Sequence, residues 1–125
     1  MADWLRKLFG GQPPPPPDDD MYQQAVLVYL PLSDDEFGDE EEREDLFELE
    51  DRLIAAIEEA AAGIFDGNEF GGGECVLFMY GPDADRLFAA VEPVLRAYEP
   101  ARGGWAIKRY GPPDDPDARE ERVEL

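Results

Sequence analysis

The chain has no histidine and only one cysteine, Cys75, among its 125 residues. Histidine is the commonest general base and metal ligand in proteins, so its absence argues against much acid–base and metal chemistry. One cysteine can form neither an internal disulfide nor a Cys-rich zinc site. We therefore predict no catalytic residue, no metal and no cofactor. Cys75 is expected to be a core residue, because no histidine is present to activate its thiol.

Basic residues are also scarce, because 11 Lys and Arg stand against 31 Asp and Glu and leave a formal net charge of −20. Phosphate contacts need clustered Lys and Arg, so the composition argues against nucleic acid as a partner. Anionic lipid headgroups would repel most of such a surface. No apolar run approaches the roughly 18–20 residues that span a bilayer, and the N-terminus lacks the apolar stretch of a signal peptide. These absences favour a cytoplasmic protein.

Residues 1–20 differ in composition from the rest of the chain. Four apolar side chains share one face of a short predicted helix, namely Trp4, Leu5, Leu8 and Phe9. Pro13–Pro17 then forms a stiff polyproline II spacer. We expect this amphipathic tip to dock on the protein's own sheet, to insert into a partner's groove or to make weak contact with a membrane, and the remaining alternative is disorder.

Residues 21–111 are predicted to form one domain, and residues 112–125 an acidic C-terminal tail. Strands are expected over residues 25–30, 64–69, 75–80 and 105–110. One helix is expected between the acidic run and Gly63, and another between Asp83 and Tyr98 with a kink or restart at Pro93. The order β-α-β-β-α-β predicts an α+β, ferredoxin-like sandwich with a four-stranded antiparallel sheet of order 4-1-3-2 and two helices on one face. The apolar first and third strands suit the centre of this sheet, and the charged strands suit its edges.

Most of the negative charge is on the first predicted helix and the residues before it. Residues 34–59 hold 14 acidic residues and two Arg, which is −12 of the total of −20. The apolar stripe of this helix is expected to include Ile54, and the opposite face carries Glu41, Glu44, Asp45, Glu48 and Asp51. This face is a candidate docking surface for a basic partner, and the alternative is a solvated face that keeps the protein soluble.

The sheet of this architecture has a second face that two helices leave uncovered. Both central strands are apolar on each side, so the second face is expected to be apolar and to serve as an interface. Alternation separates Ala25, Leu27 and Tyr29 from Val26, Val28 and Leu30 on the first strand, and Cys75, Leu77 and Met79 from Val76, Phe78 and Tyr80 on the third. Which sets share a face stays open at this point. We expect a homodimer through this face, or its burial under residues 1–20 or the C-terminal tail.

A glycine-rich stretch that ends at Gly73 contains the most site-like loop of the chain, with Asp66, Asn68 and Glu69 as its candidate functional residues. Glycine amides suit an anion, and carboxylates suit acid–base chemistry. The stretch joins two predicted strands, however, and it lacks the lysine of a phosphate-binding loop. A simple hairpin turn is the competing interpretation.

Together these features favour a small cytoplasmic binding or regulatory protein over an enzyme. Such a protein would present the acidic helix and the apolar sheet face to a protein partner, in one interpretation a basic one that it antagonises. Two alternatives stay open. One is an enzyme that uses the Asp66–Glu69 loop, and the other is a structural homo-oligomer whose acidic surface only confers solubility.

Overall fold

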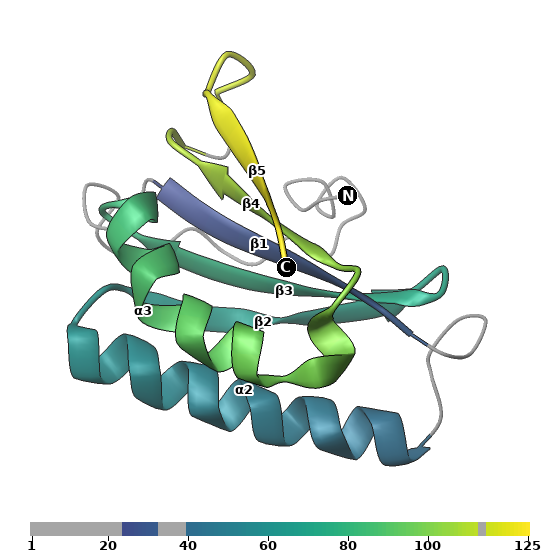
Figure 1. Cartoon of the computed structure of the whole chain (residues 1–125). Helices are drawn as coiled ribbons and strands as arrows, with labels where there is room; N and C mark the ends of the chain where they lie inside the picture. Colours follow the sequence, from purple (N-terminus) through teal and green to yellow (C-terminus); the bar gives the residue numbers. More distant parts are fainter. Residues whose placement is uncertain (1–23, 33–39, 113–114) are drawn as a thin grey trace.

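The computed structural model describes residues 24–32, 40–112 and 115–125 (Figure 1). Its elements are β1 (Gln24–Pro31), α2 (Glu40–Ala60), β2 (Ile64–Gly71), β3 (Glu74–Gly81), α3 (Ala84–Ala97), a 3-10 turn (Glu99–Ala101), β4 (Trp105–Arg109) and β5 (Glu120–Glu124). The fold is α+β, with one antiparallel sheet and two helices packed on it. None of the helices in the described ranges is both long and apolar enough to cross a membrane.

The sheet has five strands in the order β2-β3-β1-β4-β5. β1 is central and pairs antiparallel with both β3 and β4, so Leu27 lies opposite Phe78 on one side and Ile107 on the other. The first and third strands are therefore flanked on both sides, as their continuous apolar sequences predict. The prediction of a four-stranded sheet is wrong in the number of strands, because β5 extends the sheet beyond β4.

β5 comes from the segment that we expected to be an acidic tail. Four of its five residues are charged, and only Val123 is partly buried. Lys108 holds the strand in place, because its Nζ lies 3.0 Å from Asp85 Oδ1 on α3 and 3.3 Å from Glu121 Oε1 on β5. Since no apolar alternation marks this strand, charge pairing and backbone hydrogen bonds to β4 replace the usual pattern.

Both helices cover the same face of the sheet (Figure 1). The buried side chains of α2 recur every three or four residues, at Leu46, Leu49, Leu53 and Ile57. Ile54, which we expected on this stripe, is instead 37% exposed. It lies at the flank of the stripe rather than over the core.

α3 begins at an N-cap, because the Asp83 side chain accepts hydrogen bonds from the backbone N–H groups of Asp85 (2.9 Å) and Arg86 (3.3 Å). The helix continues through Pro93 without a restart. Pro93 faces solvent, and the buried residues of α3 lie on the other side of the helix. Of the two outcomes predicted at this proline, the restart is wrong and the kink stays a prediction.

The register decides which apolar sets share a face. Val26, Val28 and Leu30 join Cys75, Leu77 and Met79 under the helices. Ala25, Leu27 and Tyr29 join Val76, Phe78 and Tyr80 on the face away from the helices. The C-terminal segment does not lie over that second face, because β5 continues the sheet edge and Val123 and Leu125 pack against the helix-side core.

Candidate functional site

The acidic side of α2 carries the five carboxylates singled out in the sequence, and all five are exposed: Glu41, Glu44, Asp45, Glu48 and Asp51. We call them the acidic face. α2 begins with three glutamates, a charge that the helix N-terminus stabilises. None of the five carboxylates takes part in an ion pair or side-chain hydrogen bond within the part of the chain that the structure describes.

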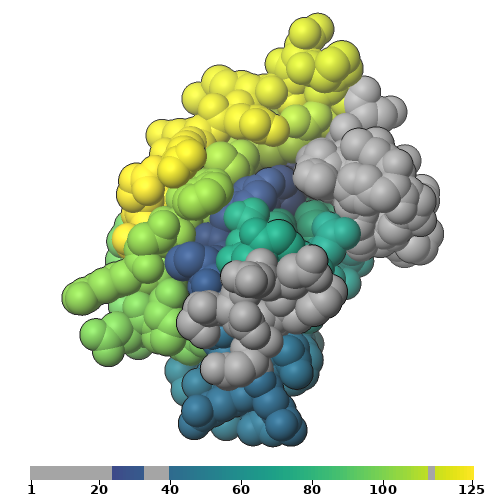
Figure 2. All heavy atoms as spheres, turned by 90° about the vertical axis from the view of Figure 1, so that its right-hand side faces the viewer, coloured from purple at the N-terminus to yellow at the C-terminus, as the bar shows by residue number. Residues whose placement is uncertain are grey.

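Cations on α3 and β4 form ion pairs with acidic residues that are not part of the acidic face. Arg96 pairs with Glu92 (2.8 Å), Arg109 with Glu120 (2.8 Å), and Lys108 with residues of α3 and β5. Figure 2 shows the C-terminal segment, in yellow, at the opposite end of the molecule from α2. α2 itself carries two cations, Arg43 and Arg52, but none of the five carboxylates of the acidic face forms an ion pair with a described cation. The face therefore keeps a net negative charge.

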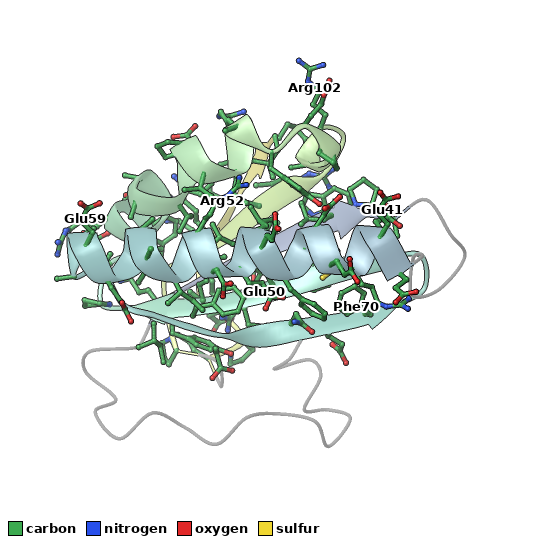
Figure 3. All side chains as sticks on the ribbon, turned by 90° about the horizontal axis from the view of Figure 1, so that it is seen from below. Glu41, Glu50, Arg52, Glu59, Phe70 and Arg102 are labelled. Atoms are coloured by element: carbon green, nitrogen blue, oxygen red, sulfur yellow. The ribbon has the colours of Figure 1, made fainter. Side chains whose placement is uncertain are left out.

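The far end of α2 is built differently from its start. Glu58 and Glu59 lie near the helix C-terminus, where negative charge is unfavourable and where no basic residue of the last turn compensates it. Arg86 Nη2 of α3 donates a hydrogen bond to the carbonyl oxygen of Ala60 (3.2 Å). Figure 3 shows Glu41 and Glu59 at opposite ends of the helix. Exposed glutamates therefore occur at both ends of α2, so charge can be removed from either end of the same helix and the effects on binding compared.

An exposed apolar pair lies beside the acidic face on the same helix. Phe47 is 50% exposed and Ile54 is 37% exposed, and the seven-residue spacing places them on one side of α2. The Phe47 ring meets the edge of Phe70 on β2, with centroids 6.4 Å apart and an interplanar angle of 72°. An open pocket at this point is lined by Arg43, Phe47, Asn68 and Phe70. Glu44 and Asp51 lie one turn before and after Phe47.

Sequence reasoning missed this pocket. The sequence held one indication of the pocket: Phe47 is a large apolar residue that falls outside the buried stripe, in an otherwise acidic stretch. The partner Phe70 was visible only as part of a glycine-rich segment. Their contact depends on how α2 packs on β2, which the spacing along either element does not encode.

The candidate functional residues Asp66, Asn68 and Glu69 all lie on edge strand β2, as the predicted strand over residues 64–69 implies, and Gly72 and Gly73 form the turn of a simple hairpin. Both turn glycines have positive φ angles, 61° and 81°, which suits a tight hairpin. Asp66 is at a β-bulge, where the register shifts between Phe65 and Gly67. The three residues do not converge on one site.

Asn68 and Glu69 point to opposite faces of the sheet. Asn68 Nδ2 donates a hydrogen bond to Glu50 Oε2 of α2. Glu69 is paired with Val76 on the face away from the helices. Figure 3 shows Glu50 and Phe70 on the β2 side of α2, with Arg52 on the α3 side. Asn68 thus fixes α2 against the sheet edge, beside the pocket.

Burial raises the pKa of Glu50, and the negative charge of Asp51 adds to this, whereas the hydrogen bond from Asn68 lowers the pKa. The folded protein therefore holds this proton to a higher pH than the unfolded chain. The stabilisation is full below the ordinary pKa of 4.5 and is lost as pH rises through the folded value. Glu50→Gln stays neutral and still accepts from Asn68.

We expect Glu50→Gln to increase the free energy of unfolding at pH 7 and to match the parent chain below about pH 4. Urea denaturation at both pH values measures this difference. Glu48→Gln is the control, since it removes one exposed negative charge from the same helix without touching Asn68. Equal effects of the two substitutions at pH 7 would show that bulk charge, rather than burial of Glu50, governs the result.

Cys75 is fully buried in the helix-side core, as predicted. Burial, followed by the charges of Glu50 and Glu74, raises the pKa of its thiol to about 12. The thiol is therefore protonated and unreactive at neutral pH. Within the described ranges, no group of three or more Cys, Asp or Glu side chains is arranged to hold a metal ion. The predicted tip residues Trp4, Leu5, Leu8 and Phe9 lie outside those ranges.

Comparison of the chain with protein-family models, with curated proteins and with solved structures found no significant match.

Proposed function

We propose that this protein is a non-enzymatic binding module that presents the acidic face of α2 to a basic partner protein and regulates that partner by occupying its surface. The observation that supports this proposal most is the state of the five carboxylates. They are exposed along one helix, and no cation of the described residues pairs with them. Such a predominantly negative surface attracts an oppositely charged partner and speeds its association.

The apolar pair next to the acidic face favours binding over mere solubility. A face that serves only to keep a protein in solution has no need of two large exposed apolar side chains, whereas interfaces combine apolar anchors with a charged rim. Phe47 and Ile54 supply the anchors, and Glu44 and Asp51 supply the rim. The partner surface that fits this arrangement carries Lys or Arg around an apolar centre.

The architecture that we propose for this module is a ferredoxin-like sandwich with one added edge strand. Support comes from the first four strands, which follow one another as β4-β1-β3-β2 when the sheet order is read from the β5 side. This architecture hosts many unrelated functions, so it lends the binding proposal no weight of its own. The residues that favour binding lie on α2.

The test compares two double variants of the full-length chain. Glu44→Gln with Glu48→Gln removes two charges from the acidic face, and Glu58→Gln with Glu59→Gln removes two from the far end of the same helix. Each changes the net charge from −20 to −18. The partner is first captured from native cells with the parent chain and eluted with rising salt, and association rates are then measured with each variant.

We expect the first variant to associate about 3- to 10-fold more slowly at low salt, because charges at an interface rim act mainly on the association rate. The second variant should stay close to the parent. Equal slowing of both would indicate that only net charge matters. Capture that resists high salt, or no capture at all, would contradict the proposal.

A further inference from the structure

The sheet face away from the helices is a second apolar surface. We call it the open face, and it comprises Ala25, Leu27, Tyr29, Ile64, Val76, Phe78, Tyr80 and Ile107. Among residues 24–32, 40–112 and 115–125, no helix or strand lies over it (Figure 1). Its members Ala25, Leu27, Phe78 and Tyr80 pack against one another as a second hydrophobic cluster. Contiguous apolar surfaces of this kind normally have an occupant.

We infer that the occupant of the open face is the protein's own N-terminal segment, residues 4–9. This segment brings four large apolar side chains, Trp4, Leu5, Leu8 and Phe9, which match an aromatic and aliphatic surface in kind. It also carries Arg6 and Lys7, the only two basic residues before Gln24. The proposed contact is on the far side of the sheet from α2, so it stands independently of the proposed function.

Acidic residues mark where the two cations would lie. Glu69 lies opposite Val76 in the sheet register and is therefore on the open-face side. Glu124, opposite Trp105, is on the same side, but it is already paired with Arg122 (Nε–Oε2 2.5 Å), whose guanidinium lies over the Trp105 ring. Glu74 alternates with Val76 two residues away and therefore shares this side. Glu69 and Glu74 are thus the carboxylates available to the two cations, and both lie toward the end of β1 that is remote from Gln24. Charge complementarity thus places Arg6 and Lys7 at that end of the face.

The length of the connecting chain is compatible with this placement. Residues 10–23, 14 residues in all, separate Phe9 from Gln24. Extended at about 3.3–3.6 Å per residue they reach roughly 46–50 Å. The five prolines of the spacer span about 15 Å, close to the roughly 17 Å from Gln24 to Tyr29 along β1. The spacer can therefore turn back at Gln24 and carry the tip along β1 to its far end.

A second copy of the chain is a weaker candidate for the same surface. Each copy carries a net charge of −20, so pairing two of them face to face brings strong repulsion. A tethered segment meets the open face at an effective concentration in the millimolar range. A second copy binds only to the extent that the protein concentration in solution allows. The segment is also positively charged, with Arg6 and Lys7 facing an acidic rim.

Paramagnetic relaxation in the full-length chain tests this inference. A nitroxide attached to Ala2→Cys reports on its neighbours by quenching nearby NMR signals, and Cys75, being fully buried, is protected from the label. We expect loss of intensity for methyl groups of Leu27, Val76 and Ile107 on the open face, and none for Leu53 under the helices. The loss should be independent of protein concentration. Leu5→Asp with Leu8→Asp should abolish it.

Gly11→Asp with Gln12→Asp is the matched control, because it adds the same two charges without touching the apolar tip, and the quenching should persist. Two outcomes would overturn the inference. One is a monomer without quenching on the open face. The other is quenching that appears only as a dimer forms, measured by light scattering, which would make a second copy the occupant. A partner protein bound to the open face in place of the tip would give the first of these outcomes, because the methyl groups of the open face would not be quenched.

Discussion

Replacing Gly81 by alanine should lower the free energy of unfolding by about 3 kcal/mol, because it forces two backbone segments apart. An alanine Cβ at this position would lie 2.3 Å from the carbonyl oxygen of Ala62, and a Cβ at Gly63 would lie 2.0 Å from the carbonyl oxygen of Tyr80. The chain leaving α2 crosses the end of β3 here. Backbone atoms cannot rotate out of the way as a side chain does, so α2 itself must shift. Urea denaturation followed by circular dichroism measures the loss.

Gly71→Ala is the control for this prediction. Gly71 ends β2 much as Gly81 ends β3, but no atom lies within 4 Å of the position that its Cβ would take. We expect this variant to stay within about 0.5 kcal/mol of the parent. If the two variants unfold at the same urea concentration, the close approach of the two segments is not what holds the end of α2 in place.

A chain that ends at Arg119, and so lacks β5, should lose about 3 kcal/mol of its free energy of unfolding. Val123 and Leu125, which pack against the helix-side core, are removed. The largely buried Arg109 side chain loses its partner Glu120, and Lys108 loses Glu121. β4 becomes the sheet edge, so its amide protons should exchange faster with solvent.

A second variant separates apolar packing from the charge pairs. Val123→Ala with Leu125→Ala keeps the backbone ladder and all the ion pairs, and it should cost only about 1–2 kcal/mol because both side chains are partly exposed. Hydrogen exchange of the Trp105–Arg109 amides, together with urea denaturation, measures both variants. A truncated chain that is as stable as the parent would show that β5 is an accessory to the sheet rather than part of it.

Much of the fold was predictable because its signals are local. The continuous apolar runs of β1 and β3 indicated central strands, and the spacing of Leu46, Leu49, Leu53 and Ile57 indicated a helix with one buried face. Gly63 and the turn glycines marked the ends of elements. Each of these signals depends on residues a few positions apart, which interact whatever the rest of the chain does.

The features that escaped prediction depend on contacts between distant segments. β5 has no apolar pattern and becomes a strand only because β4 offers it a backbone edge and Lys108 and Arg109 offer it charge partners. Asp66, Asn68 and Glu69 were singled out as one candidate functional group, but strand alternation and the bulge at Asp66 separate them. Ile54 is exposed because it lies beside the stripe of Leu46, Leu49, Leu53 and Ile57 that faces the core, rather than within it.

The candidate site divides in the same way. The five carboxylates of the acidic face were identified from their positions along one helix, and the structure places all five in solvent. The pocket between Phe47 and Phe70 was not identified, since it exists only where α2 meets β2. Which acids are neutralised depends partly on packing, because Lys108 and Arg109 of β4 meet Asp85, Glu121 and Glu120 only once α3, β4 and β5 lie side by side.

The amino-acid sequence by itself determined which segments are apolar on both sides, where the first helix buries its stripe, and that −12 of the net charge of −20 is concentrated in residues 34–59. Only the tertiary structure decided that Ala25, Leu27 and Tyr29 share a face with Val76, Phe78 and Tyr80, and that the acidic C-terminal segment supplies a fifth strand. The physical reason is that periodicity and charge are properties of neighbouring residues. Register and edge pairing are set by which distant strand supplies the hydrogen bonds.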